Sequence, residues 1–213
     1  MELTLTERLA RAKKVAAKLK QEFPQVDSPL LYKNAHELLF AVILSAQCTD
    51  ELVNRTTPQL FACYKTVQDF AEADLAELTK LVASVNYYKT KAKNIKAAAA
   101  KLVAEFDEKV PAEMEQLLEL PGIGRKSANV VLSTWFGKNL GFVVDTHVKR
   151  IAWRTRLTEH TDPVKIELNL LAVFPRKDWR DLSLRMIFHG RSTCKASRKP
   201  GESCSLGELC DRL

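Results

Sequence analysis

The sequence has little of what builds membrane spans or disulfide frameworks. Its longest clearly apolar run, Leu38–Leu44, falls far short of the roughly 20 residues that cross a bilayer. The first residues lack a basic segment followed by an apolar one, so we expect no secretory signal and a cytoplasmic protein. Cysteine is scarce and odd in number, 5 in all, with three near the end of the chain. This pattern favours a local metal or cluster site over disulfides, with Cys48 and Cys63 as small core residues.

Strand-like alternation, long linkers, internal repeats and low-complexity tracts are also scarce. Apolar residues instead recur at helical spacing. Thr4 and Glu7 form a capping box before the first such segment, which predicts a helix through about Phe23. Further helices are predicted over residues 36–46, 50–63, 74–83, 89–106, 112–118, 125–135, 146–154, 163–174 and 178–188. The expected fold class is therefore all-α.

Basic residues outnumber acidic residues, 33 to 26, which gives a formal net charge of +7. This balance favours a polyanionic partner such as nucleic acid, although a solvated basic surface would give the same count. The length of 213 residues and the hydrophobic content of 46% fit one or two globular domains with a real core.

Glycine is scarce as well, with 7 in the chain, yet two lie in the segment Leu120–Asn129, which reads LPGIGRKSAN. Because Gly122 and Gly124 lack a Cβ, both can adopt positive φ and let backbone N–H groups approach an anion. The helix that follows adds the positive end of its dipole and carries Lys126 near its start. A phosphate clamp beside an amine indicates chemistry on DNA.

This segment, together with Val144-Asp145-Thr146-His147 downstream, resembles the helix-hairpin-helix and catalytic aspartate of endonuclease III, a family of DNA glycosylases. Residues 44–50 (LSAQCTD), residues 189–191 (HGR) and a terminal cysteine cluster also match, in the family's order. Several ordered matches carry more weight than one short motif. The resemblance implies a six-helix domain over residues 28–138 that contains the hairpin. It implies a second helical domain from residues 1–27 and 139–213, with a DNA-binding cleft between the two.

The resemblance further implies that Lys126 and Asp145 are catalytic. A lysine amine that attacks C1′ of deoxyribose forms an imine, which permits β-elimination of the 3′ phosphate. The amine must be neutral, whereas an ordinary lysine is protonated at neutral pH. Placement at a helix N-terminus and partial desolvation both favour the neutral form. Asp145 would take up protons and stabilise the oxocarbenium-like sugar.

Both residues also have simpler interpretations. Lys126 could be a solvated lysine or a non-catalytic phosphate contact, and Asp145 could be an ordinary helix cap. Within the family, however, lysine at the position of Lys126 marks members that also cleave the strand, whereas adenine-specific mismatch glycosylases carry another residue. We therefore predict a bifunctional DNA glycosylase and AP lyase of base excision repair that acts on oxidised pyrimidines.

The expected partner is double-stranded DNA, bound by a monomer that does not associate with membranes and works at the nucleoid. Two alternatives stay open. One is a monofunctional adenine or mismatch glycosylase, and the other is a non-catalytic helix-hairpin-helix module, which would need the hairpin but neither Lys126 nor Asp145.

A glycosylase must extrude its target nucleotide, so residues that fill the gap are expected. Gln47 matches the family's polar plug. Tyr87 stands where a leucine wedge is usual, and Asn86 where glycine is usual; an aromatic ring can stack on a neighbouring base. These residues could equally be ordinary loop residues. The remaining predicted DNA contacts are Gly122, Gly124, Arg125, Lys89 and Arg191.

The terminal cysteines resemble the family's iron–sulfur loop, C-x6-C-x2-C-x5-C. Cys194, Cys204 and Cys210 fit three positions, while Gly201 stands where the second cysteine belongs. A [4Fe–4S] cluster normally has four thiolate ligands. Three outcomes stay open. They are a cluster whose fourth iron takes Glu202, another oxygen ligand or water; a zinc ion held by the cysteines and His189; and a loop without metal. We favour the cluster, because the remaining spacing keeps the loop geometry that it needs.

Overall fold

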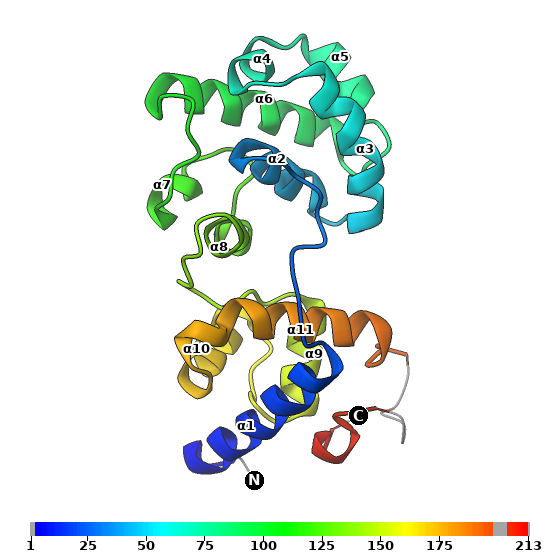
Figure 1. Ribbon diagram of the computed structural model, residues 1–213, viewed down its shortest axis with the longest axis vertical. Coiled ribbons are helices and arrows are strands. Elements are labelled where there is room, and N and C mark those ends of the chain that lie inside the picture. Colours follow the sequence, from blue (N-terminus) through cyan, green and yellow to red (C-terminus); the bar gives the residue numbers. More distant parts are fainter. Residues whose placement is uncertain (1–2, 198–203, 213) are drawn as a thin grey trace. The chain divides into compact units, whose positions relative to one another are not determined.

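The computed structural model describes residues 3–197 and 204–212 of the chain (Figure 1). All regular secondary structure in these residues is helical, so the predicted all-α class is confirmed. The chain divides into two compact units. Unit 1 consists of Met1–Asp27 and Asn139–Leu213, and unit 2 consists of Ser28–Lys138. None of the described helices is long and apolar enough to cross a membrane.

Unit 2 contains seven helices, one more than the six expected from the sequence. They are α2 (Ala35–Ser45), α3 (Asp50–Cys63), α4 (Val67–Glu72), α5 (Leu75–Leu81), α6 (Tyr88–Glu105), α7 (Met114–Leu118) and α8 (Arg125–Thr134). The additional helix, α4, has only 6 residues and begins at a capping box formed by Thr66 and Asp69. So short a helix shows no clear apolar period, which is why the sequence did not predict it.

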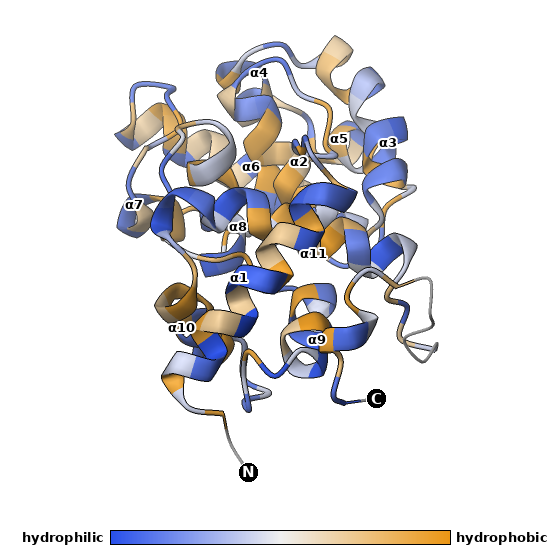
Figure 2. Cartoon of the chain, turned by 60° about the horizontal axis from the view of Figure 1, so that its bottom comes forward, coloured by the Kyte–Doolittle hydropathy of each residue, from blue (hydrophilic) through white to orange (hydrophobic). Residues whose placement is uncertain are grey.

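The core of unit 2 is built around α2. All residues of the apolar run Leu38–Leu44 are buried, and α2 contacts α3, α6 and α8. Phe40 also packs on Phe70 of α4, with 4.5 Å between ring centroids. Figure 2 shows α2 as hydrophobic along nearly its whole length. A helix that is apolar on every face is a core helix, and α2 therefore supports the loops and helices that carry the predicted DNA contacts.

Unit 1 joins the two ends of the chain. It consists of α1 (Leu5–Glu22), α9 (Thr146–Arg154), α10 (Pro163–Val173), the 3-10 turn η1 (Arg176–Asp178), α11 (Trp179–Ser192) and the 3-10 turn η2 (Gly207–Leu209). The predicted capping box at α1 is confirmed: Glu7 N donates to Thr4 Oγ1 at 3.3 Å, and Thr4 N donates to Glu7 Oε2 at 2.7 Å. α1 packs against α10 and α11.

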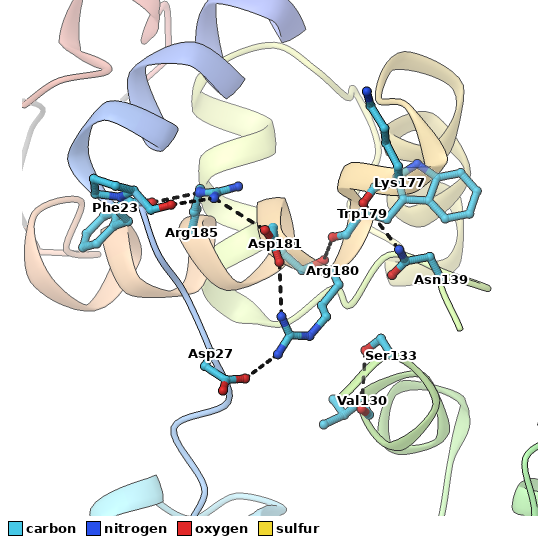
Figure 3. Close-up of polar contacts among 12 residues, drawn as sticks. Phe23, Asp27, Val130, Ser133, Asn139, Lys177, Trp179, Arg180, Asp181 and Arg185 are labelled. Atoms are coloured by element: carbon cyan, nitrogen blue, oxygen red, sulfur yellow. Dashed lines mark hydrogen bonds and ion pairs between the residues drawn. The ribbon is translucent and has the colours of Figure 1, made fainter. Parts of the chain in front are cut away.

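The segment after α1 is fastened to α11 by an arginine (Figure 3). Arg185 donates from Nε to Phe23 O at 2.9 Å and from Nη2 to Pro24 O at 3.1 Å. Arg180 pairs with Asp27 in the same region. These bonds satisfy two backbone carbonyls of the segment that follows α1, and they hold residues far apart in the sequence in one unit.

Two sequence expectations require correction. Cys63 is exposed and Cys48 is only half-buried, so neither is a core residue. Cys63 is the last residue of α3 and Cys48 lies in the loop between α2 and α3, so neither is on the buried face of a helix. In addition, α11 continues to Ser192, beyond the predicted end at residue 188, and the motif His189-Gly190-Arg191 lies within this helix.

Candidate functional site

A tight turn connects α7 to α8 in unit 2. Pro121 and Gly122 are its central residues, and Ile123 N donates to Leu120 O at 3.1 Å. Gly122 has φ +84°, as the third position of a type II turn requires. A Cβ at this position would lie 2.9 Å from Asn94 Nδ2. Gly122 is therefore required by both its conformation and the space around it.

Gly124 has a different backbone. Its φ of −104° and ψ of 175° are extended, so the expectation of positive φ is confirmed for Gly122 and wrong for Gly124. Gly124 is the N-cap of α8 and, having no side chain, makes no cap hydrogen bond to the N–H groups of that helix. A Cβ here would meet no described atom within 4 Å. The start of α8 thus offers donor groups and open space, which suits an anion such as phosphate.

The predicted lysine lies in the first turn of α8, beside Arg125. Both Lys126 and Arg125 are exposed. The helix terminus that we expected beside Lys126 is present. We also expected partial desolvation of the Lys126 amine. In the protein without DNA, however, this side chain is exposed to water. A ligand that covers α8 would have to exclude this water.

Asp145 belongs to unit 1, where it is the N-cap of α9. Its Oδ1 accepts from His147 N and from Val148 N, each at 2.8 Å. The helix-cap interpretation is therefore correct. Both cap bonds use the same oxygen and hold a half-buried carboxylate at a fixed position.

The two histidine-containing motifs meet where α9 packs on α11. A Cβ on Gly190 would lie 2.6 Å from His147 Cβ, so only glycine permits this approach. Arg150 reinforces it by donating from Nη2 to Gly190 O at 2.9 Å and to Cys194 O at 2.7 Å. These contacts hold the helix that Asp145 caps. Arg191, in the last turn of α11, is exposed.

The predicted wedge residues lie on two loops that the structure brings together. Gln47 follows α2 and has φ +52°, and Tyr87 precedes α6 and has φ +56°. This left-handed conformation is uncommon outside glycine. Asn86 joins the loops by donating from Nδ2 to Gln47 O at 2.7 Å. Gln47, Tyr87 and Lys89 are all exposed, Tyr87 to 66%.

The three terminal cysteines are free thiols in different surroundings. Cys194 is 4% exposed, and Arg154 Nη1 donates to its Sγ at 3.1 Å. Burial acts to raise the pKa of Cys194, but hydrogen bonds from His189 and Arg154 outweigh it and lower the pKa to about 7. Burial raises the pKa of Cys210 to about 11, and the neighbouring charges of Cys204 and Cys194 add to this. Burial thus determines the pKa shift of Cys210, whereas hydrogen bonds determine that of Cys194.

His189 is fully buried and held by Glu22. Its Nδ1 lies 2.9 Å from Glu22 Oε2, and its Nε2 lies 3.6 Å from Cys204 Sγ. Glu22 also accepts from Thr193 Oγ1 at 3.1 Å and from Ser205 Oγ at 2.5 Å. Burial acts to lower the pKa of His189, yet its hydrogen bond with Cys194 and the charge of Glu22 outweigh burial and raise the pKa. His189 thus joins α1, α11 and the cysteine loop.

The donor set fits an iron–sulfur cluster only in part. Three thiols are available for three irons, whereas Gly201 has no side chain to offer the fourth. Gly201 and the alternative ligand Glu202 both lie outside the described residues. Within residues 3–197 and 204–212, no group of three or more His, Cys, Asp or Glu side chains is arranged to hold a metal ion. A preformed zinc site with three cysteines and His189 is therefore not present there.

One residue near the wedge loops was missed by the sequence analysis. Lys91 is 5% exposed and donates from Nζ to Leu44 O, at the end of α2, at 2.7 Å. Burial lowers the pKa of Lys91. The available signal was its spacing from Ile95 and Ala98, which places a lysine on the apolar face of α6.

Comparison with known proteins agrees with this geometry. The sequence model of the HhH-GPD superfamily of base excision DNA repair proteins matches residues 40–176. Endonuclease III from Synechocystis sp. is 48% identical over 202 residues, which cover 94% of this chain and 91% of that protein. Endonuclease III from Bacillus subtilis is 40% identical over 194 residues, 91% of this chain and 88% of that protein. A solved structure of a trapped endonuclease III–DNA covalent intermediate has a TM-score of 0.91 and 38% identity, and covers 98% of this chain and 96% of that one.

Proposed function

The chain belongs to the endonuclease III family within the HhH-GPD superfamily of base excision DNA repair proteins, and from this premise we propose which residues perform its chemistry. It is a bifunctional DNA glycosylase and AP lyase. Its partner is double-stranded DNA, as for the endonuclease III–DNA complexes that it resembles. The substrates are oxidised pyrimidines, and both steps use Lys126 with Asp145.

Lys126 is the nucleophile. Its neutral Nζ attacks C1′ of the damaged nucleotide, the glycosidic C–N bond breaks, and the base leaves with the electron pair. The amine gives one proton to Asp145, which passes a proton to O4′ as the C1′–O4′ bond breaks, so that the ring opens to a protonated imine at C1′. Loss of a C2′ proton then expels the 3′ phosphate by β-elimination. The supporting observation is the position of Lys126, exposed in the first turn of α8 directly after the hairpin. Bound DNA would supply the missing desolvation.

Asp145 acts on the same nucleotide as Lys126. Its carboxylate takes up a proton from the attacking amine and stabilises positive charge on the sugar as the glycosidic bond breaks. Its cap bonds, at 2.8 Å to His147 N and Val148 N, fix the group before substrate arrives. A fixed carboxylate needs no reorganisation during the reaction.

The helix-hairpin-helix and its basic neighbours hold the duplex. The N–H groups at the start of α8 bind a DNA phosphate, and the absence of a Cβ at Gly124 lets the backbone approach it. Arg125, Lys89 and Arg191 contribute charge. Gln47 and Tyr87 fill the gap that the extruded nucleotide leaves.

The cysteine loop holds a [4Fe–4S] cluster through Cys194, Cys204 and Cys210, with a non-cysteine ligand at the fourth iron. The support is the family's loop spacing, which Cys194, Cys204 and Cys210 match at three of the four positions. A cluster at this position would cross-link the loop to α11. The reaction steps assigned to Lys126 and Asp145 do not depend on it.

Substitution of the nucleophile tests this function. We expect Lys126→Gln to abolish strand cleavage and the borohydride-trapped complex with duplex DNA, and to retain most duplex binding. Lys14→Gln, at an exposed position of α1, is the matched control because it removes the same charge, and it should react like the unaltered protein. Unchanged trapping by Lys126→Gln would remove Lys126 from the mechanism.

A further inference from the structure

We infer that Asn86 is a positioning residue that fixes Gln47 and Tyr87 as one preformed wedge for opening duplex DNA. This inference rests on the DNA-contact role proposed for Gln47 and Tyr87. Asn86 would assist the opening of the duplex without contact between its side chain and the reacting nucleotide.

The backbone of the wedge is the first observation. Gln47 and Tyr87 both adopt left-handed φ values, +52° and +56°, that side chains with a Cβ disfavour. Residues in such conformations persist only where surrounding contacts hold them. Both side chains are exposed, so their own burial does not provide that support.

Two anchors hold these conformations. On the buried side, Lys91 donates from Nζ to Leu44 O at 2.7 Å and from its backbone N to Tyr87 O at 3.0 Å. Lys91 therefore ties the end of α2 to the start of α6. On the solvent side, Asn86 donates from Nδ2 to Gln47 O at 2.7 Å. This hydrogen bond links the loop of Gln47 directly to the loop of Tyr87.

This link depends on the side chain of Asn86. A glycine at position 86, usual in the family, has no side chain with which to reach Gln47. The neighbouring wedge residue differs too, because Tyr87 replaces an apolar side chain with a ring. A ring stacks on a base only when its face is correctly oriented, so it gains from a fixed backbone. If the loops of Gln47 and Tyr87 are fixed before DNA binds, less conformational entropy is lost when the two side chains insert into the duplex.

The test compares Asn86→Ala with Gln47→Ala, with Tyr87→Ala, and with Asn86→Ala made in a variant that carries both wedge substitutions. Single-turnover excision of a ring-saturated pyrimidine is measured in a duplex and in the same strand unpaired. We expect Asn86→Ala to slow excision from the duplex about fivefold, as expected for loss of one hydrogen bond, with little change on the single strand. In the background that lacks both wedge side chains, Gln47→Ala with Tyr87→Ala, this effect should largely vanish. Asn86→Gly serves as a second variant and should act in the same direction.

Asn54→Ala is the matched control. Asn54 Nδ2 donates to Pro29 O at 2.8 Å, a bond of the same type within unit 2 but between other segments, and its Oδ1 also accepts from Leu31 N at 2.9 Å. Its loss should lower the melting temperature and leave the ratio of duplex to single-strand rates unchanged. 2-Aminopurine beside the lesion should show less unstacking with Asn86→Ala than with Asn54→Ala.

The outcomes separate the inference from the function on which it rests. If Gln47→Ala slows duplex excision and Asn86→Ala does not, the positioning role is wrong and the wedge stands. If neither Gln47→Ala nor Tyr87→Ala affects duplex excision, the wedge itself is wrong. Equal losses on both substrates, or an undiminished effect of Asn86→Ala in the background that lacks both wedge side chains, would show that Asn86 only stabilises the fold.

Discussion

Asp145 combines a structural and a proposed chemical role in one side chain. Its Oδ1 caps α9 through two backbone N–H groups at 2.8 Å, and we propose that the same carboxylate assists Lys126. The roles are compatible because the cap fixes the group that the chemistry needs. They can be separated because asparagine caps a helix about as well as aspartate, but carries no negative charge.

We predict different effects from two substitutions of Asp145. Asp145→Asn keeps the cap, so the free energy of unfolding should change by less than about 0.5 kcal/mol, while single-turnover excision falls strongly. Asp145→Ala loses the cap and should also destabilise the protein by about 1 kcal/mol. Denaturant unfolding and excision rates measure the two effects. If Asp145→Asn unfolds readily or retains full activity, Asp145 is only a cap.

At the scale of elements, the α7–α8 hairpin uses its two glycines for different reasons. Gly122 lies in a left-handed turn against Asn94, whereas Gly124 is extended and faces open space. Gly190 is needed for close packing between helices, because the absence of a Cβ allows α11 to approach His147 of α9. Gly122 and Gly190 therefore serve packing, while the bare backbone at Gly124 suits the close approach of a ligand.

The hairpin glycines should therefore respond differently to alanine. Gly122→Ala places a Cβ in a left-handed conformation and against Asn94, so it should cost at least about 1 kcal/mol of stability. Gly124→Ala should change stability by less than about 0.5 kcal/mol and weaken duplex binding. Thermal unfolding and fluorescence anisotropy with a lesion-containing duplex distinguish the two. Strong destabilisation by Gly124→Ala, or unimpaired binding, would contradict a phosphate contact there.

At the scale of the whole molecule, the N-terminal helix closes unit 1 against the C-terminal residues. Arg11 pairs with Asp211 at 2.8 Å and donates to Leu209 O at 2.7 Å. Together with the contacts of Glu22 and Arg154, these bonds hold the segment around the cysteines to the helices. The loop is thus attached through protein contacts as well as through any cluster.

The metal content of the whole protein is a direct prediction. Protein purified without oxygen should contain iron and acid-labile sulfide near the stoichiometry of a [4Fe–4S] cluster, with a matching visible spectrum. Cys194→Ser should lose most of the iron. Stoichiometric zinc without sulfide, or iron-free protein that still cleaves damaged DNA, would contradict the cluster.

Features set by neighbouring residues could be predicted from the sequence. The capping box of Thr4 and Glu7, the bounds of α3 and α9, and the turn at Gly122 all depend on local chemistry. The tether from Asn86 to Gln47 and the burial of Lys91 could not be predicted, because they join segments about 40 residues apart that only the folded core brings together. The backbone of Gly124 was predicted wrongly, since glycine permits both conformations.

The nucleophile is identified by locating the covalent bond that it forms with DNA. The protein is reacted with a duplex containing an oxidised pyrimidine, trapped with borohydride, digested, and sequenced by mass spectrometry. We predict a reduced sugar adduct on Nζ of Lys126, within the peptide that begins α8. An adduct on another amine, or strand cleavage without any trapped adduct, would contradict the assignment of Lys126 as the nucleophile.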